Sequence, residues 1–149
     1  MSGLPGVEDD GVELDQEEIS LVEELAHRTS SMVDALKDKN ASKVFDPLFA
    51  GYGAMIAAYG DIIAGGILFE LKAVDRGFRG TDFRQLMTYC LLNSYEKGST
   101  IDSIVLINAR RGIYHFAPLN DFVFDTSAST FQDIQLRFAS AVGIGGTSR

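Results

Sequence analysis

Residues 59–72, which read YGDIIAGGILFELK, decide the fold. The pair Gly65-Gly66 separates two short apolar segments, and two adjacent glycines are typical of a two-residue hairpin turn because both tolerate a positive φ. Such a turn fixes the pairing of the flanking residues on both sides. We therefore predict an antiparallel hairpin with strands at about 59–64 and 67–74. One face of its second strand should carry Ile67, Phe69 and Leu71, and the other Leu68, Glu70 and Lys72.

This register brings three charged side chains of the hairpin to one face. Asp61 stands directly opposite Glu70, and opposed residues on antiparallel strands have Cβ atoms about 5 Å apart. Because side chains alternate along a strand, Lys72 shares this face with Glu70. Facing carboxylates repel each other without a cation, and apolar neighbours make their unpaired charge costly. The hairpin therefore predicts a cation site between the two carboxylates.

Length and composition indicate one globular domain. The chain has 149 residues, of which 46% are hydrophobic and 23% charged, which is enough to bury a core. A lone cysteine, Cys90, excludes an intrachain disulfide and is typical of a reducing compartment. The longest uncharged stretch, 47–60, is shorter than the roughly 20 residues of a membrane helix, and the start lacks the pattern of a secretory signal. We expect a cytoplasmic protein with no membrane partner.

The net charge of −8 belongs to the N-terminal part of the chain. Residues 1–40 contain 11 acidic and three basic side chains, whereas residues 41–149 contain ten of each. We predict an acidic mobile leader at 1–13, a single domain at 14–142 and a flexible tail at 143–149. A neutral body of this kind should have only modest affinity of its own for nucleic acid.

Helices and strands alternate along the rest of the chain. Apolar spacings of three and four predict an amphipathic helix from about Leu14 to Asn40. A second helix, at about 82–97 and capped by Thr81 or Asp82, has apolar residues on most sides and should be buried. The other predicted elements are a buried strand within 52–58, strands at 103–109 and 113–116, a short edge strand at 122–124, and a last helix at 130–141. This order predicts a mixed α/β fold with a central mixed sheet flanked by helices.

The charged residues of the hairpin are spaced like a known motif. Gly60-Asp61, followed after eight residues by Glu70-Leu71-Lys72, resembles the core motif of the PD-(D/E)XK nuclease superfamily. Gln85 and Tyr89, four residues apart on one face of the second helix, resemble the Q-x-x-x-Y element of RecB-type members. The resemblance covers roughly residues 15–116, and Gly60 stands where the motif name has proline. It implies a restriction-endonuclease-like core.

The chemistry expected of this site is phosphodiester hydrolysis with Mg²⁺ or Mn²⁺. Hard divalent ions prefer oxygen ligands, here Asp61, Glu70 and the main-chain carbonyl of Leu71. The expected catalytic residues are Asp61, Glu70, Lys72 and Gln85, with Lys72 orienting the attacking water or stabilising the transition state. Some family members take another ligand from a glutamate of the first helix. Four glutamates of the first predicted helix compete for that role: Glu17, Glu18, Glu23 and Glu24.

The expected substrate is DNA, or alternatively RNA. The resemblance implies that Gln85 and Tyr89 contact the nucleic acid or support the metal site. Arg76, Arg79 and Arg84 precede or open the second helix and could bind phosphate near its N-terminus, although an ordinary charged loop explains them equally well. We expect the neutral domain to act as a homo-oligomer, or with a helicase, guide or targeting subunit, in phage defence, restriction or DNA repair.

Two other functions remain open. One is a nuclease fold that no longer cuts and serves as a module for nucleic-acid binding or complex assembly. The other is an unrelated α+β interaction domain, in which Glu70 and Lys72 form a solvated ion pair worth under about 1 kcal/mol. Carboxylates of Asp61 and Glu70 on opposite faces of the sheet would exclude both nuclease-like interpretations.

Overall fold

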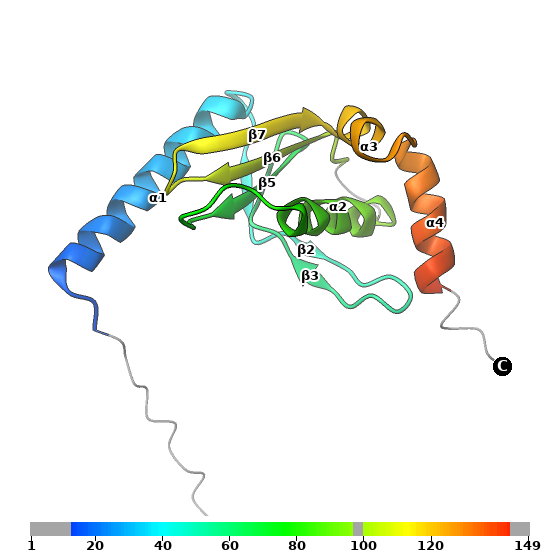
Figure 1. Cartoon of the computed structure of the whole chain (residues 1–149), viewed down its shortest axis with the longest axis horizontal. Coiled ribbons are helices and arrows are strands. Elements are labelled where there is room, and N and C mark those ends of the chain that lie inside the picture. Colours follow the sequence, from blue (N-terminus) through cyan, green and yellow to red (C-terminus); the bar gives the residue numbers. More distant parts are fainter. Residues whose placement is uncertain (1–12, 97–99, 144–149) are drawn as a thin grey trace, which may run out of the picture.

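The computed structural model describes residues 13–96 and 100–143, which form helices on both sides of a central sheet (Figure 1). This is the mixed α/β fold that the sequence predicts. Its elements in chain order are α1 (Gln16–Leu36), β1 (Lys43–Phe45), β2 (Leu48–Phe49), β3 (Ala58–Tyr59), β4 (Ile62–Ala64), β5 (Ile67–Lys72), α2 (Gly80–Ser94), β6 (Ser103–Asn108), β7 (Ile113–Pro118), α3 (Leu119–Ser127) and α4 (Phe131–Gly143). Among these helices none is long and apolar enough to cross a membrane.

Five strands form the central sheet, in the order β1-β4-β5-β6-β7. The β5–β6 pair is parallel and the other neighbours are antiparallel. A parallel pair needs a crossover connection, which α2 provides here. Strands β2 and β3 form a separate two-stranded sheet. The edges of the central sheet are therefore the short β1 on one side and the six-residue β7 on the other.

The hairpin of β4 and β5 has the predicted register. Ala64 pairs with Ile67 and Ile62 with Phe69 across the turn. Gly65 and Gly66 both have positive φ, 57° and 79°, as a type I′ turn requires. The strands are shorter than predicted, but every predicted pair within them is confirmed.

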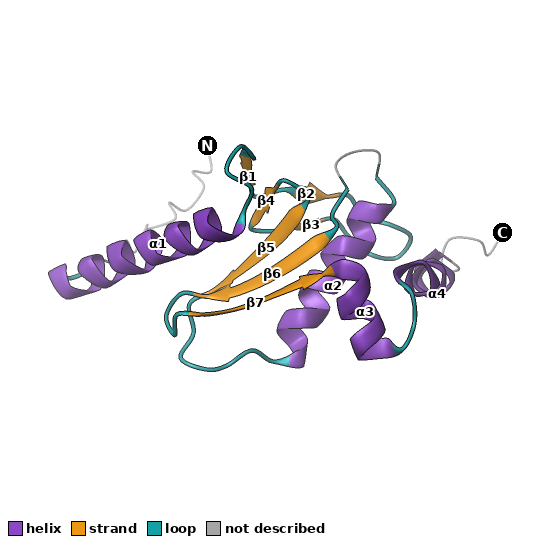
Figure 2. Ribbon diagram, turned by 90° about the horizontal axis from the view of Figure 1, so that it is seen from above, coloured by secondary structure: helices purple, strands orange, loops and turns teal. Residues whose placement is uncertain are grey.

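Two apolar clusters hold the helices against opposite faces of the sheet. On one face, Val33 of α1 is buried against Phe69 and its neighbours on β4 and β6. On the other, Leu86 of α2 is buried with Leu68 and Leu106. The first turns of α1 extend beyond the sheet (Figure 2). The predicted alternation along β5 is therefore confirmed, and Glu70 shares the α2 face with Leu68.

The buried strand predicted within 52–58 is wrong. Tyr52 and Met55 form a tight turn, and Ile56 is 84% exposed. Tyr52 packs beside the helices instead: its ring stacks on Tyr95, just after α2, with centroids 4.0 Å apart, and on Phe138 of α4. Gly53, with a φ of 57°, allows the close approach to α4, where an added Cβ would overlap a main-chain oxygen.

The edge strand predicted at 122–124 is also wrong, since these residues lie in α3. Leu119 and Val123 are the buried residues of this helix and stand four apart, which is helical spacing. Strands β1 and β2 were not predicted, and each has at most three residues. The predicted leader and tail lie outside the described residues except for Glu13 and Gly143.

Candidate metal centre

Asp61 immediately precedes β4 and is fixed by hydrogen bonds on both sides. Its main-chain carbonyl accepts the N–H of Asp46 at 3.0 Å. Its Oδ2 accepts the N–H of Leu71 at 2.7 Å, which ties the carboxylate to β5. Because the N–H and C=O of one residue point to the same side of a strand, the Leu71 carbonyl also faces the β4 side. The structure thus brings together two of the three predicted metal ligands.

Glu70, the third predicted ligand, is a buried carboxyl in the middle of the sheet. The residue is only 3% exposed. Burial raises its pKa to about 6, even though a hydrogen bond from Lys72 lowers it. The nearby Asp61 carboxylate adds to the rise. Asp61 and Glu70 are therefore electrostatic neighbours, although the pairing of β4 with β5 ends at Ile62 and Phe69, one residue short of the predicted pair.

A chain of hydrogen bonds connects Glu70 to α2. The Nζ of Lys72 donates to Glu70 Oε1 at 2.8 Å and to Gln85 Oε1 at 2.9 Å. The amide nitrogen of Gln85 in turn donates to the Tyr89 hydroxyl at 2.7 Å. The predicted residues of the hairpin and of α2 thus form one connected group of polar side chains, and the lysine is held from two sides.

The donor set of this group suits a hard divalent cation. Glu70 Oε2 is buried and accepts no hydrogen bond from a donor among the described residues, although the carboxyl of Asp61 is close enough to share a proton with Glu70 and so helps to raise its pKa. An orphaned carboxylate oxygen beside a second carboxylate is costly unless a cation binds there. No group of three or more His, Cys, Asp or Glu side chains within the described residues could hold a metal. A bound Mg²⁺ would keep water or phosphate in its other positions, as this ion commonly does.

None of the four competing glutamates of α1 joins the two carboxylates. The face of α1 near Asp61 presents Thr29 and Ser30, which line a cavity of about 360 Å³ with Asp61 and Leu71. Glu17, Glu18, Glu23 and Glu24 are all exposed. Of these, Glu18 accepts a main-chain N–H at the start of α1 and Glu24 pairs with Arg28. The sequence did not single out Asp46, which lines the same cavity.

The three predicted phosphate-binding arginines differ in their surroundings. Arg76 makes two hydrogen bonds, of 2.8 and 3.1 Å, to the carboxylate of Asp82, whose side chain is only 5% exposed. This pairing is the main reason that the pKa of Asp82 falls to about 2. Arg76 therefore anchors the start of α2. Arg79 and Arg84 are exposed around the first turn of that helix.

The loop between β5 and α2 has an anchor that sequence reasoning missed. The side-chain amide of Asn108 donates to the carbonyls of Val74 and Arg76, at 2.8 Å each. Asn108 is fully buried and pairs with Lys72 across the parallel strands. In the sequence, the only indication of this role is that Asn108 is a polar residue at the end of the apolar run IVLIN, residues 104–108.

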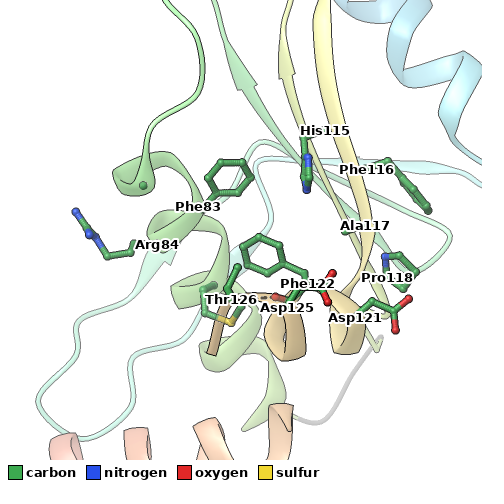
Figure 3. A pocket seen from close by; sticks show the side chains of 12 residues that line it. Phe83, Arg84, His115, Phe116, Ala117, Pro118, Asp121, Phe122, Asp125 and Thr126 are labelled. Atoms are coloured by element: carbon green, nitrogen blue, oxygen red, sulfur yellow. Dashed lines mark hydrogen bonds between the residues drawn. The ribbon is translucent and has the colours of Figure 1, made fainter. Parts of the chain in front are cut away.

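A larger cavity of about 780 Å³ lies elsewhere, between α2, β7 and α3. The rings of Phe83, His115 and Phe122 gather in it, and Asp121 and Asp125 lie beside it on α3 (Figure 3). Phe83 meets His115 edge-on at 5.3 Å. Neither Asp61 nor Glu70 lines this cavity, so it is separate from the two-carboxylate site.

Comparisons of the chain with protein-family models, curated proteins and solved structures give no match. The family therefore remains an expectation from the motif, and the function is inferred from the geometry of the hairpin and of α2.

Proposed function

We propose that the protein is a Mg²⁺- or Mn²⁺-dependent nuclease of the PD-(D/E)XK type. The observation that carries the proposal is the buried Glu70, which has an unpartnered oxygen, lies beside Asp61, and is bonded to Lys72. A solvated surface ion pair would leave Glu70 and Lys72 exposed, but Glu70 is buried and the Lys72 side chain is only 18% exposed. A buried carboxyl of this kind is costly to keep, which favours a functional role.

Asp61, Glu70 and the carbonyl of Leu71 would hold the divalent ion. When bound, such an ion lowers the pKa of a coordinated water and neutralises charge on the phosphate. The oxygen of Asp61 that is not bonded to Leu71 and the unpartnered oxygen of Glu70 are the atoms free for this purpose. Glu70 lies on β5, and Asp61 immediately precedes β4 and is bonded to Leu71 of β5, so the ligands are held in place before any ion binds.

Lys72 supplies the positive charge of the site. Its ammonium is held between Glu70 and Gln85, one residue beyond the proposed Leu71 ligand. From this position it can orient the attacking water and stabilise negative charge on the phosphate in the transition state. Gln85 accepts from the lysine through its oxygen because its nitrogen donates to Tyr89, so Tyr89 fixes the orientation of the amide.

The proposed substrate is DNA, with RNA as the alternative. Arg79 and Arg84 are exposed cations around the start of α2 and would contact the phosphate backbone, while the buried Tyr89 would support the site through Gln85. The neutral body of the chain supplies little general attraction for nucleic acid. We infer that the domain acts as a homo-oligomer or with a targeting subunit in the cytoplasm, in phage defence, restriction or DNA repair.

The test is cleavage of end-labelled single- and double-stranded DNA and RNA in Mn²⁺, Mg²⁺ or EDTA. The wild-type chain should cut at least one substrate with either metal and none in EDTA. Glu70→Gln and Lys72→Ala should each reduce cleavage at least about 100-fold. The matched controls Glu17→Gln and Lys39→Ala alter exposed residues and should cut like the wild type. Equal cutting by Lys72→Ala and the wild type would refute the proposal, and metal-dependent binding without cutting would identify a non-cutting module.

A further inference from the structure

The outer edge of β7 pairs with no other strand of the described sheet. β7 is the last strand of the sheet and contains no charged residue over Ile113–Pro118. Tyr114 and Phe116 are 55% and 46% exposed. Proteins normally protect such edges with charges, bulges or a covering element, because exposed strand edges pair with other chains. An uncharged six-residue edge, protected only by Pro118 at its end, is therefore open to pairing with another strand.

The main-chain groups that this edge offers follow from the register. His115 pairs with Leu106 of β6, and the ladder ends with the N–H of Leu119 donating to Asp102 at 2.8 Å. Main-chain groups alternate in direction along a strand. Those of His115 therefore turn toward β6, and the N–H and C=O groups of Tyr114 and Phe116 turn outward.

We propose that a second copy of this chain pairs with β7 in an antiparallel manner, on a two-fold axis that passes through His115. In this register Tyr114 lies opposite the second copy's Phe116, and Phe116 opposite the second copy's Tyr114. All outward N–H and C=O groups of both residues are then paired. A register centred on Phe116 would place Tyr114 opposite Pro118, which has no N–H to donate. The register centred on His115 is therefore favoured.

The side chains of the edge are self-complementary in this register. Tyr114 pairs with Ile107 and Phe116 with Val105, so both aromatic rings lie on the α1 face of the sheet. Cross-strand aromatic pairs form twice across the two-fold axis, and such pairs stabilise antiparallel strands. The same two residues thus supply the main-chain pairing and the apolar contact.

Charge complementarity favours a second copy over an unrelated strand. The turn before β7 carries Arg110 and Arg111, both exposed. In the proposed register Arg111 of one copy stands opposite position 119 of the other, at the start of α3. This helix carries Asp121 and Asp125, which lie beside the end of β7 in Figure 3. The basic turn of each copy therefore meets the acidic helix of the other, at both ends of the interface.

Two charge-reversed variants, measured alone and as a mixture, test this interface. One variant carries Arg110→Glu and Arg111→Glu, and the other carries Asp121→Lys and Asp125→Lys. Each variant alone places like charges against each other and should shift the dimer dissociation constant upward at least tenfold. The equimolar mixture should form a heterodimer, because opposite charges then meet at both ends. The readout is mass by light scattering over about 1–100 μM, with circular dichroism showing that each variant is folded.

A second pair of variants keeps the test decisive if a charge-reversed chain is unstable. Tyr114→Lys places a charge on the proposed edge and should give a monomer, whereas Val44→Lys alters an exposed residue of the opposite edge strand, β1, and should leave the dimer intact. A wild-type chain that is monomeric at 100 μM overturns the proposal, as does a dimer that survives Tyr114→Lys or a mixture that gains no heterodimer. These outcomes do not depend on nuclease activity.

Discussion

The raised pKa of Glu70 predicts that the stability of the folded chain depends on pH. Its folded pKa of about 6 lies above the ordinary 4.5, so the folded chain retains a proton that the unfolded chain has lost. The free energy of unfolding should therefore fall as pH rises from about 4.5 through 6. A difference of this size corresponds to roughly 2 kcal/mol. Without metal, the carboxyl of Glu70 thus opposes folding at neutral pH.

The first prediction follows from this fall in the free energy of unfolding with rising pH. Glu70→Gln keeps the shape of the side chain but removes its titration, so it should be more stable than the wild type at pH 7.5 by up to about 2 kcal/mol. At pH 4.5 the difference should vanish, because the wild-type carboxyl is then largely protonated. Urea unfolding in EDTA at both pH values measures this. A stability difference that does not change with pH would contradict the raised pKa.

The second prediction concerns Tyr89, which acts through Gln85 on Lys72. Tyr89→Phe removes the hydroxyl that accepts from Gln85 but keeps the ring stacked on Phe49, with centroids 5.3 Å apart. Loss of this hydrogen bond should lower the free energy of unfolding by about 1 kcal/mol. Because the released Gln85 amide no longer holds Lys72 in place, kcat should also fall, by about fivefold. Steady-state cleavage kinetics check this, and a wild-type kcat in Tyr89→Phe would show that the hydroxyl does not position the lysine.

At the scale of elements, α2 depends on a buried ion pair at its start. Asp82 accepts from Arg76 and from the N–H of Arg79, so it anchors the preceding loop and begins the helix. The helix begins at Gly80, slightly earlier than the predicted cap at Thr81 or Asp82, because the Asp82 side chain reaches back to Arg79. This arrangement also positions Gln85, which lies one turn further along.

The third prediction compares two helix-start carboxylates. Asp82→Ala removes the charge-assisted hydrogen bonds from Arg76 and from the N–H of Arg79 and should lower the free energy of unfolding by about 2 kcal/mol. Asp133→Ala removes an exposed carboxylate bonded to Thr130 at the start of α4 and should lower the free energy of unfolding by much less. Because the Asp82 pKa falls to about 2, its contribution is present above pH 3.8 and lost as pH falls through 2. Equal losses in denaturant unfolding would contradict this difference.

The sequence allowed the hairpin and the placement of its carboxylates to be predicted because both depend on local features. Adjacent glycines set the hairpin register, and alternation then placed Asp61 and Glu70 together without any long-range information. The segment 52–58 was misassigned because an apolar run alone does not distinguish a buried strand from a loop packed on helices. The α1 glutamates could not be assigned because Val33 and its neighbours set the rotation of that helix against the sheet, which is a tertiary contact.

At the scale of the whole molecule, the proposed dimer relates two carboxylate sites. Glu70, Leu106 and His115 lie in one row across the sheet on the α2 face. Five strand spacings of about 4.8 Å then separate the two copies of Glu70, or roughly 24 Å before sheet twist. Both sites face the same side, so one duplex could be cut on both strands.

The fourth prediction combines the two proposals. On supercoiled plasmid the wild-type dimer should produce linear DNA with little nicked intermediate. Monomeric Tyr114→Lys should retain single-strand cleavage but accumulate nicked circles, because it holds one site at a time. Agarose gels of a time course separate these products. Identical product ratios would show that the dimer, if it forms, does not couple the two cuts.

A calorimetric Mn²⁺ titration tests most directly whether Asp61 and Glu70 share a divalent cation, because it requires no knowledge of the substrate. The wild-type chain should bind one ion per chain at pH 7.5, and more weakly at pH 5.5, where Glu70 is largely protonated. Glu70→Gln should weaken binding at least about tenfold, while the exposed control Glu17→Gln should not. Absence of saturable binding, or equal affinity in the wild type and Glu70→Gln, would contradict the metal centre.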